Sequence, residues 1–343
     1  MQIESFPWSP QPAAFEFVRG VAADFLASVP AAAALADRMR RETGTRFIDW
    51  IDHVCLNRGD ARAARLSGAG YASAGGSPQV SAFANDGGIF PTVLVREGPA
   101  EVALRVESIA DFLAANRLRR DVQGNPADRL KTCRIYETSA GALTVVERHG
   151  TREFQPGISA SADPKLWRLH LENFRVRPRD FANEEDGFAA AHRLIDAATA
   201  DLGRDLACDL WFAAEREFYM SRNLASRAQK ARQDRLGLGW ANHDHHTYRC
   251  SRKNFRLLVA TWEKLGLRCR ERFYAGREAG WGAQVMEQPV TGIVTFNDVD
   301  LTPDELAGDF GHDGLPEQDR LGTVGLWCGL HGDSFLQSGL HHL

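Results

Sequence analysis

Three histidines stand within four positions of the chain, in the stretch GWANHDHHTYRCS that covers residues 239–251. The threonine, tyrosine and cysteine of this stretch favour a β-strand, in which successive side chains point to opposite faces. His243 and His245 are therefore expected to share one polar face with Arg249, whereas His246 points to the opposite, mostly apolar face. The polar face is suited to line a cup-shaped site.

The Asp-His pair of this stretch occurs twice in the sequence. It stands at residues 52–53 in the strand-like run IDHVCL, and again at residues 244–245. Each pair is followed by a strand that ends on Val-x-Glu, which gives Glu147 in the first unit and Glu287 in the second. Strand alternation places each glutamate on an otherwise apolar face. The order of histidine and then glutamate is thus repeated in two units.

A carboxylate among apolar neighbours is costly to bury unless it is paired or bound to a metal. Two histidines with one or two glutamates make up ligand sets for Fe(II), Mn(II), Zn or Ni, and two histidines with one carboxylate leave open positions, as in non-haem Fe(II) oxygenases. A single strand histidine is more often a core residue, and a strand-end glutamate is more often solvated. The repeated order is what favours a metal site built from His53, His245 and one or both of Glu147 and Glu287.

The elements that must position these residues follow from apolar periodicity. Strands are expected at residues 47–56, 101–106, 131–137, 142–147, 243–250, 268–274 and 282–287, with 294–300 as a final strand or edge. Helices are expected at residues 15–26, 31–41, 109–116, 187–199, 207–235 and 254–265, and loops over 57–97. The predicted fold class is α+β, with two βαβββ-type units forming a cupped mixed sheet around a metal and with additional helices.

The predicted organisation has five segments: a helical N-terminal preface (1–46), a first unit with a loop insertion (47–150), a helical connector (151–238), a second unit (239–300) and an irregular tail (301–343).

The 343 residues include 41 Lys and Arg against 45 Asp and Glu, a net charge of −4 that gives no sign of a nucleic-acid or acidic-membrane partner. No apolar run reaches the roughly 18 residues of a membrane span. Six scattered cysteines without a CxxC pair, and an N-terminus without signal-peptide features, predict a reduced, cytoplasmic protein.

Repeated units with a histidine on the first strand and a glutamate on the last resemble the vicinal oxygen chelate superfamily, over residues 47–150 and 240–300. A narrower resemblance is to the 2-oxoadipate dioxygenase/decarboxylase (hydroxyglutarate synthase) family. The matching motifs are the helical preface FLASVPAAAALADRM, the strand IDHVCL, and Ala-Asn before the His-His-Thr of residues 245–247. They are short motifs in the family's order and not a long identity.

The resemblance implies an Fe(II) ion held by His53, His245 and Glu287, with Mn, Ni or Zn as other candidate metals. It also implies a small 2-oxo acid and O2 as substrates. Oxidative decarboxylation would then be coupled to hydroxylation of the remaining fragment. Glu147 would lie near the site and be less essential. The sequence departs from the family at one position, because the family's arginine four residues after the first histidine is replaced by Asn57.

Another arginine must then hold the anionic substrate. Arg58 is one residue too far along and points to the opposite face if the strand continues. Arg249, four residues after His245 and on its face, is the candidate, with a solvated strand-end charge as the alternative. Three other functions remain compatible with the motifs: a glyoxalase-like lyase or isomerase that uses Glu147 as fourth ligand or general base, an extradiol ring-cleaving dioxygenase, and a ligand-binding protein of the same superfamily without activity.

Overall fold

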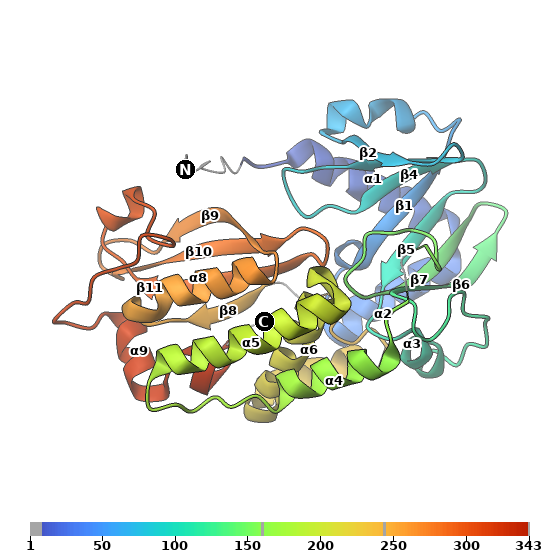
Figure 1. Cartoon of the computed structure of the whole chain (residues 1–343). Coiled ribbons are helices and arrows are strands. Elements are labelled where there is room, and N and C mark those ends of the chain that lie inside the picture. Colours follow the sequence, from blue (N-terminus) through green and yellow to red (C-terminus); the bar gives the residue numbers. More distant parts are fainter. Residues whose placement is uncertain (1–8, 159–160, 243–244, 342–343) are drawn as a thin grey trace.

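The computed structural model describes residues 9–158, 161–242 and 245–341. Within these ranges the chain forms two β-sheets flanked by helices (Figure 1). The large sheet has seven strands in the order β2-β3-β4-β1-β5-β7-β6, and the small sheet has four in the order β8-β11-β10-β9. The predicted α+β class is confirmed. The division of the chain into five segments stays a prediction.

The bounds of the elements are as follows. The strands are β1 (Ile51–Asn57), β2 (Ala72–Gly76), β3 (Val80–Ala84), β4 (Thr92–Arg96), β5 (Glu101–Arg105), β6 (Leu130–Thr138), β7 (Gly141–Arg148), β8 (His246–Arg249), β9 (Arg268–Tyr274), β10 (Trp281–Gln288) and β11 (Ile293–Asp300). The helices are α1 (Pro12–Ser28), α2 (Pro30–Thr43), α3 (Ile109–Ala115), α4 (Pro164–Arg175), α5 (Glu184–Leu202), α6 (Arg204–Arg222), α7 (Leu224–Asp234), α8 (Phe255–Lys264) and α9 (Thr323–His331).

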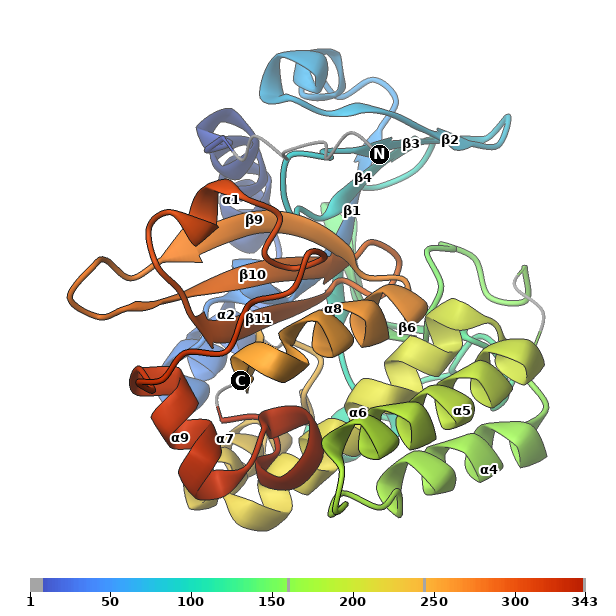
Figure 2. The ribbon, with the colours of Figure 1, turned by 60° about the vertical axis from the view of Figure 1, so that its left-hand side comes forward.

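The small sheet is built from one βαβββ unit. β8 leads through α8 into the antiparallel strands β9, β10 and β11, and β11 then pairs in parallel with β8. Figure 2 shows α8 lying along this sheet. Because β8 pairs with the outer side of β11, that last strand lies inside the sheet and not at its edge. The sequence alone leaves open whether residues 294–300 form an inner strand or an edge strand.

The large sheet departs from this pattern. β1 lies between β4, which is parallel to it, and β5, which is antiparallel. β7 pairs with β5 and β6, so β5 separates the strand of His53 from the strand of Glu147. The two units are therefore not equivalent in strand pairing. The stretch expected to be loops contains β2, β3 and β4, and β2 (ASAGG) is exposed along its whole length, so no buried face revealed it.

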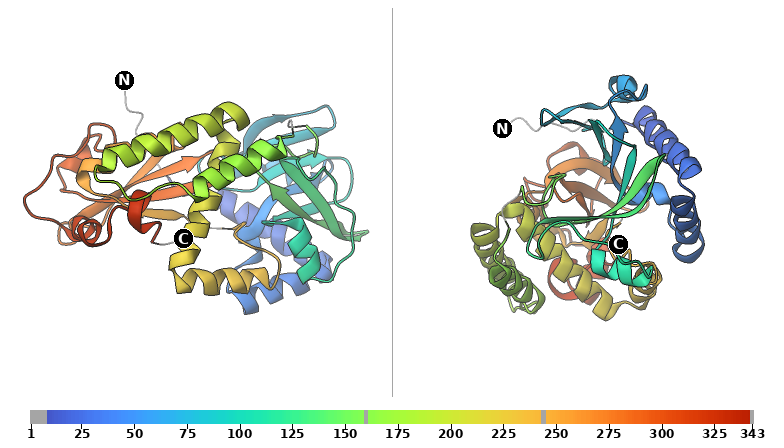
Figure 3. Two further views of the ribbon diagram at one scale, coloured as in Figure 1. Left: turned by 60° about the horizontal axis from the view of Figure 1, so that its bottom comes forward. Right: turned by 90° about the vertical axis from the view of Figure 1, so that its right-hand side faces the viewer.

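Two hydrophobic layers hold the sheets. The α1–α2 pair lies along one side of the large sheet (Figure 3), where α1 and α2 share a core cluster with β1, β5 and β7. Helices α5, α6 and α8 enclose the other core, in which Trp211, Phe212 and Trp262 are fully buried against the small sheet.

Three helices differ from expectation, and the first is α4, an additional helix within the predicted helical connector. The long helix expected over 207–235 is broken at Asn223, whose side chain accepts a hydrogen bond from the Ser226 backbone N–H at 3.0 Å and caps α7. The tail, expected to be irregular, contains α9. Its first turn is capped from a distance by Asp300, whose carboxylate accepts hydrogen bonds from three backbone N–H groups of that turn.

No helix in the described ranges is by itself long and apolar enough to cross a membrane. Helices α1 and α2 satisfy length and composition only when they are taken together, and they are bent by 117° from one another.

Candidate active site

His53 is held by a carboxylate that is itself held by an arginine. The imidazole is 5% exposed, and its Nδ1 lies 2.7 Å from Oδ2 of Asp52. Arg148, at the end of β7, donates to the same carboxylate through Nε (2.9 Å to Oδ1) and Nη2 (2.8 Å to Oδ2). This is the arrangement in which a carboxylate orients a metal-binding imidazole, with Nε2 as the atom left for the metal.

The local backbone and packing explain how adjacent residues meet. The register of β1 against β5 shifts between Ile51 and His53, which breaks the alternation that would point Asp52 and His53 to opposite faces. The ring of Phe154 packs edge-on against His53, with the ring centroids 5.1 Å apart. Burial alone would lower the pKa of His53, but hydrogen bonding to Asp52 and Cys55 outweighs it and raises the pKa to about 9.

His245 lies immediately before β8, on the face opposite its neighbour. Its side chain lines a cavity of about 380 Å³ together with Arg270 and Phe296, and its ring centroid is 5.4 Å from that of Phe296. His246 instead is fully buried against Phe212 on the helix-covered face. The two histidines therefore point to opposite faces, as strand alternation predicts. His243 lies outside the described residues.

Glu287 lies on β10 and is paired with an arginine. Arg270 of β9 donates through Nη1 to Oε2 of Glu287 at 2.6 Å. Strand alternation places Glu287 on the face of Val285, which lines the same cavity as His245. The carboxylate is therefore on the expected face, but its charge is already neutralised by a neighbouring guanidinium.

The three predicted ligands are not gathered into a metal site in the described part of the chain. Groups of three or more ligand atoms within 4.8 Å of one another do not include His53, His245 and Glu287 together. His53 belongs to the large sheet and the other two to the small sheet, so the relative placement of the sheets decides their distance. Their donor atoms, two imidazole nitrogens and a carboxylate, do fit a divalent metal chemically. Their common site stays a prediction.

The carboxylate of Glu147 is engaged by partners away from His53. Its Oε2 accepts the backbone N–H of Ile109 at 3.0 Å, and its Oε1 contacts Lys131 and, at 3.1 Å, Nε2 of His149. Strand alternation places Glu147 on the face of Val145, in the core shared with α3, which is the face opposite His53. Glu147 thus fastens the first turn of α3 to the sheet, and its part in catalysis stays a prediction.

Arg249 is stacked on an aromatic ring. Its guanidinium carbon lies 4.8 Å from the ring centroid of Trp327 in α9. Across the strand pair stands Asp298, which is 5% exposed and whose Oδ1 is buried without a hydrogen-bond partner among the described residues. Burial raises the pKa of Asp298 to about 7, and the charges of Arg249 and His245 oppose that rise. Arg249 as a substrate contact stays a prediction, and Asp298 is a residue that the sequence did not single out.

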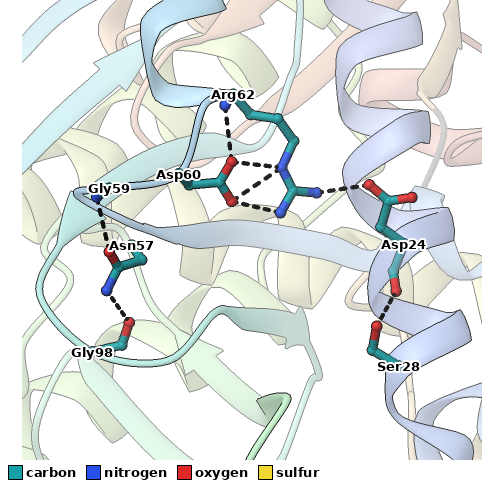
Figure 4. Close-up of polar contacts among 7 residues, drawn as sticks. All are labelled: Asp24, Ser28, Asn57, Gly59, Asp60, Arg62 and Gly98. Atoms are coloured by element: carbon teal, nitrogen blue, oxygen red, sulfur yellow. Dashed lines mark hydrogen bonds and ion pairs between the residues drawn. The ribbon is translucent and has the colours of Figure 1, made fainter.

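Asn57 closes the turn after β1. Its Nδ2 donates to the Gly98 carbonyl at 2.8 Å, and its Oδ1 accepts from the Gly59 N–H at 2.8 Å (Figure 4). Beside it, Arg62 is bound to Asp60 and Asp24. The position that carries an arginine in the resembled family is therefore used here to fasten a loop.

The two arginines next to this turn, Arg58 and Arg62, form their described contacts away from His53 and His245. Arg58 is directed to the surface, where it pairs with Glu97 at 3.5 Å and donates to the Gln79 carbonyl. An arginine for the substrate must come from another element.

Arg105, the last residue of β5, faces a cavity on the His53 side of the large sheet. It lines a cavity of about 640 Å³ at the end of the large sheet where β1 begins, together with Asp52. Its Nη1 donates to the Thr291 carbonyl at 3.0 Å, which joins the two sheets at this point. In the described ranges Arg105 forms no ion pair, and burial lowers its pKa although Asp52 and Asp209 oppose the shift.

Sequence reasoning missed Arg105 because its only local signal is strand alternation. Val102 and Leu104 point into the α1–α2 core, so Arg105 points to the other face, the one that carries His53. The partner of Arg105 on that face, the carbonyl of Thr291, comes from a distant part of the chain, so the local sequence gives no sign of it.

No family model and no curated protein sequence matches the chain. Solved structures similar to it include a glyoxalase/bleomycin resistance protein/dioxygenase superfamily member from Vibrio splendidus 12B01, at 12% identity over 28% of this chain and 95% of that one, with a TM-score of 0.21. Glyoxalase I from Zea mays is 11% identical over 73% of this chain and 68% of that one (TM-score 0.21). The Mn(II)-bound glyoxalase from Novosphingobium aromaticivorans is 14% identical over 74% and 83% (TM-score 0.22). Scores of this size leave the function to be argued from the side chains.

Proposed function

We propose that this chain is a metal-dependent dioxygenase that decarboxylates a small 2-oxo acid and hydroxylates the remaining fragment. In this reaction both atoms of O2 enter the organic product and CO2, and one CO2 leaves for each 2-oxo acid consumed. The observation that carries the proposal is the guanidinium of Arg105, which lines a cavity of about 640 Å³ and has no carboxylate partner among the described residues.

Arg105 is half-buried, and a guanidinium that is partly removed from water is normally paired, because an uncompensated charge with reduced hydration is costly. A carboxylate matches it through two parallel hydrogen bonds. A 2-oxo acid would supply the missing negative charge. The same cavity is also lined by apolar side chains suited to the carbon chain of such an acid: Phe15, Val18, Ile48, Trp50, Ile89 and Phe90.

His53, His245 and Glu287 would hold the metal. When bound, iron supplies the activation of O2 and of the keto acid. The chain's own residues supply orientation: Asp52 fixes the His53 ring, and Arg148 fixes Asp52. Arg270 pairs with Glu287 in this structure, and the pair would have to open for the carboxylate to bind the metal.

An isomerase of the glyoxalase kind would need Glu147 at the metal. Both oxygens of Glu147 are engaged with α3, Lys131 and His149, on the face opposite His53. This placement favours the dioxygenase with one glutamate ligand over the enzyme with two.

The test is oxygen consumption by the purified full-length chain, reconstituted anaerobically with Fe(II) and supplied with a panel of 2-oxo acids. Arg105→Lys keeps the charge but loses the planar fork, so we expect KM to rise about tenfold or more, roughly one charge-assisted hydrogen bond, with iron content unchanged.

Arg46→Lys is the matched control, because Arg46 lines the same cavity but its guanidinium is already bound to Asp49. Its KM should stay at the wild-type value. Absence of oxygen uptake with every 2-oxo acid, from a protein that holds iron, would overturn the proposed reaction. An unchanged KM in Arg105→Lys would overturn the role of Arg105 alone.

A further inference from the structure

A second group of ligand-type side chains lies on the small sheet, away from the cavity of Arg105. Glu263 near the end of α8, Cys269 on β9 and His312 in the tail place one carboxylate oxygen, the thiol sulfur and one imidazole nitrogen within 4.8 Å of one another. Cys269 packs with Met286 on the helix-covered face, whereas His245 lines the opposite face. The group is therefore separate from the proposed active site.

The imidazole of His312 is oriented as in a metal site. Its Nδ1 lies 2.7 Å from Oδ2 of Asp309, a carboxylate that is 8% exposed. Its Nε2 lies 2.7 Å from Oε1 of Glu263, so the coordinating nitrogen already points into the group. A carboxylate that holds the far nitrogen of a histidine is the usual second partner of a metal-bound imidazole.

The backbone that carries the three residues is fixed. Gly266, with φ of 86°, ends α8, and the N–H of Leu267 reaches back to the Trp262 carbonyl at 3.0 Å. Glu263 and Cys269 therefore stand on the two sides of one rigid turn. The tail segment is held by Arg272, which donates to the Gly308 carbonyl at 2.7 Å and lies 5.4 Å from the ring centroid of Phe310.

We propose that Glu263, Cys269 and His312 form a site for a zinc-type divalent cation that fastens the tail to the α8–β9 turn. One nitrogen, one sulfur and one oxygen donor suit Zn²⁺ and its spectroscopic substitute Co²⁺, with a fourth position open to water. Mg²⁺ and Ca²⁺, which take oxygen ligands, do not fit this set.

The charges of the group agree with a cation. Burial, and then the negative charges of Glu263 and Asp309, raise the pKa of the Cys269 thiol to about 12. A metal would bind the Cys269 sulfur as the thiolate. The side chains of Glu263 and His312 are 43% and 37% exposed, so an ion can enter from solvent.

The test is a titration of the chelator-treated full-length protein with Co²⁺, followed by absorption spectroscopy. We expect one equivalent to give a sulfur-to-cobalt charge-transfer band, and Zn²⁺ to remove the band by competition. Cys269→Ser should abolish it, and His312→Gln should weaken cobalt binding at least tenfold. Asp309→Asn should weaken it about 10- to 100-fold, as loss of an outer partner does.

Two controls separate this site from other sites and from misfolding. His331→Gln changes an exposed histidine of α9 that lies outside the group, and His53→Ala changes the proposed active site; both should keep the band. Zn²⁺ should raise the melting temperature of the wild type and not that of His312→Gln, a surface change that leaves the core intact. A band that persists in Cys269→Ser, or no sulfur-to-cobalt band in the wild type, would overturn the proposal.

Discussion

Arg148 binds Asp52 through two parallel hydrogen bonds, of 2.9 Å and 2.8 Å, across 96 positions of sequence. Both side chains are about 7% exposed or less. Since Asp52 also holds His53, this ion pair connects β7 to the orientation of a predicted metal ligand. Burial alone would raise the pKa of Asp52, but the charge of Arg148 and the hydrogen bond to His53 hold it well below its usual range.

Asp52→Asn should therefore weaken metal binding without removing a ligand. The amide cannot balance the charge of Arg148 or fix the His53 tautomer in the same way, so we expect the affinity for Fe(II) to fall about 10- to 100-fold. Metal titration of the apoprotein measures this. Asp49→Asn, an acid three residues earlier that pairs with an exposed arginine, is the control and should keep wild-type affinity. Equal affinity in both variants would contradict the orienting role of Asp52.

Glu147→Gln should cost stability and not metal. The free energy of unfolding at neutral pH should fall by about 1–3 kcal/mol, because Lys131 and His149 lose a buried charged partner. Burial alone would raise the pKa of Glu147, but hydrogen bonds from His149, Lys131 and the Ile109 N–H outweigh it and lower the pKa to about 2.

The sign of the pH dependence follows from that lowered pKa. The stabilisation by Glu147 is fully present above its unfolded pKa of about 4.3 and is lost as the pH falls towards 2. Denaturant titrations at several pH values should show the difference between wild type and Glu147→Gln shrinking in acid. Glu137→Gln, on the exposed end of β6, should show almost no difference at any pH. Metal loss in Glu147→Gln would instead favour the four-ligand, glyoxalase-like reading.

Arg249→Lys should raise KM for the 2-oxo acid while iron content stays unchanged. The lysine keeps the charge on the face of His245 but loses the planar fork and part of its packing on Trp327. Steady-state kinetics with parallel iron analysis give the answer. Arg222→Lys, which changes an exposed arginine 5.3 Å from the Phe218 ring centroid, is the matched control. Wild-type kinetics in Arg249→Lys would reduce Arg249 to a packing residue.

Asp300→Ala should loosen the tail. Its carboxylate accepts hydrogen bonds from Gly322, Val324 and Gly325, which are the free N–H groups at the start of α9. Loss of such a cap costs about 1–2 kcal/mol, and hydrogen exchange of these amides should accelerate. Asp304→Ala, at an exposed position four residues later, should change neither quantity. Unchanged exchange in Asp300→Ala would show that α9 does not depend on this cap.

The sequence determined what depends on near neighbours. Strand alternation separated His245 from His246, and β9 was predicted at its observed bounds. Ser108, a residue type favoured at helix N-termini, caps α3 by accepting a hydrogen bond from the Asp111 N–H. These features follow from side-chain direction and local hydrogen bonding, which a short stretch of chain fixes by itself.

Only the tertiary structure decided the partners. The oxygens of Glu147 are taken by α3 and Lys131, Glu287 is taken by Arg270, and the neighbour of Arg105 is the carbonyl of residue 291. Strand β2 is exposed along its whole length and gave no periodic signal. The insertion of β2, β3 and β4, of which β4 pairs with β1, changed the strand pairing of the first unit. Which face of a strand a side chain takes is a local matter. Which residues that face contacts depends on how the two sheets pack against each other. Such contacts join residues far apart in the chain, such as Arg105 and Thr291, and local residue spacing does not predict them.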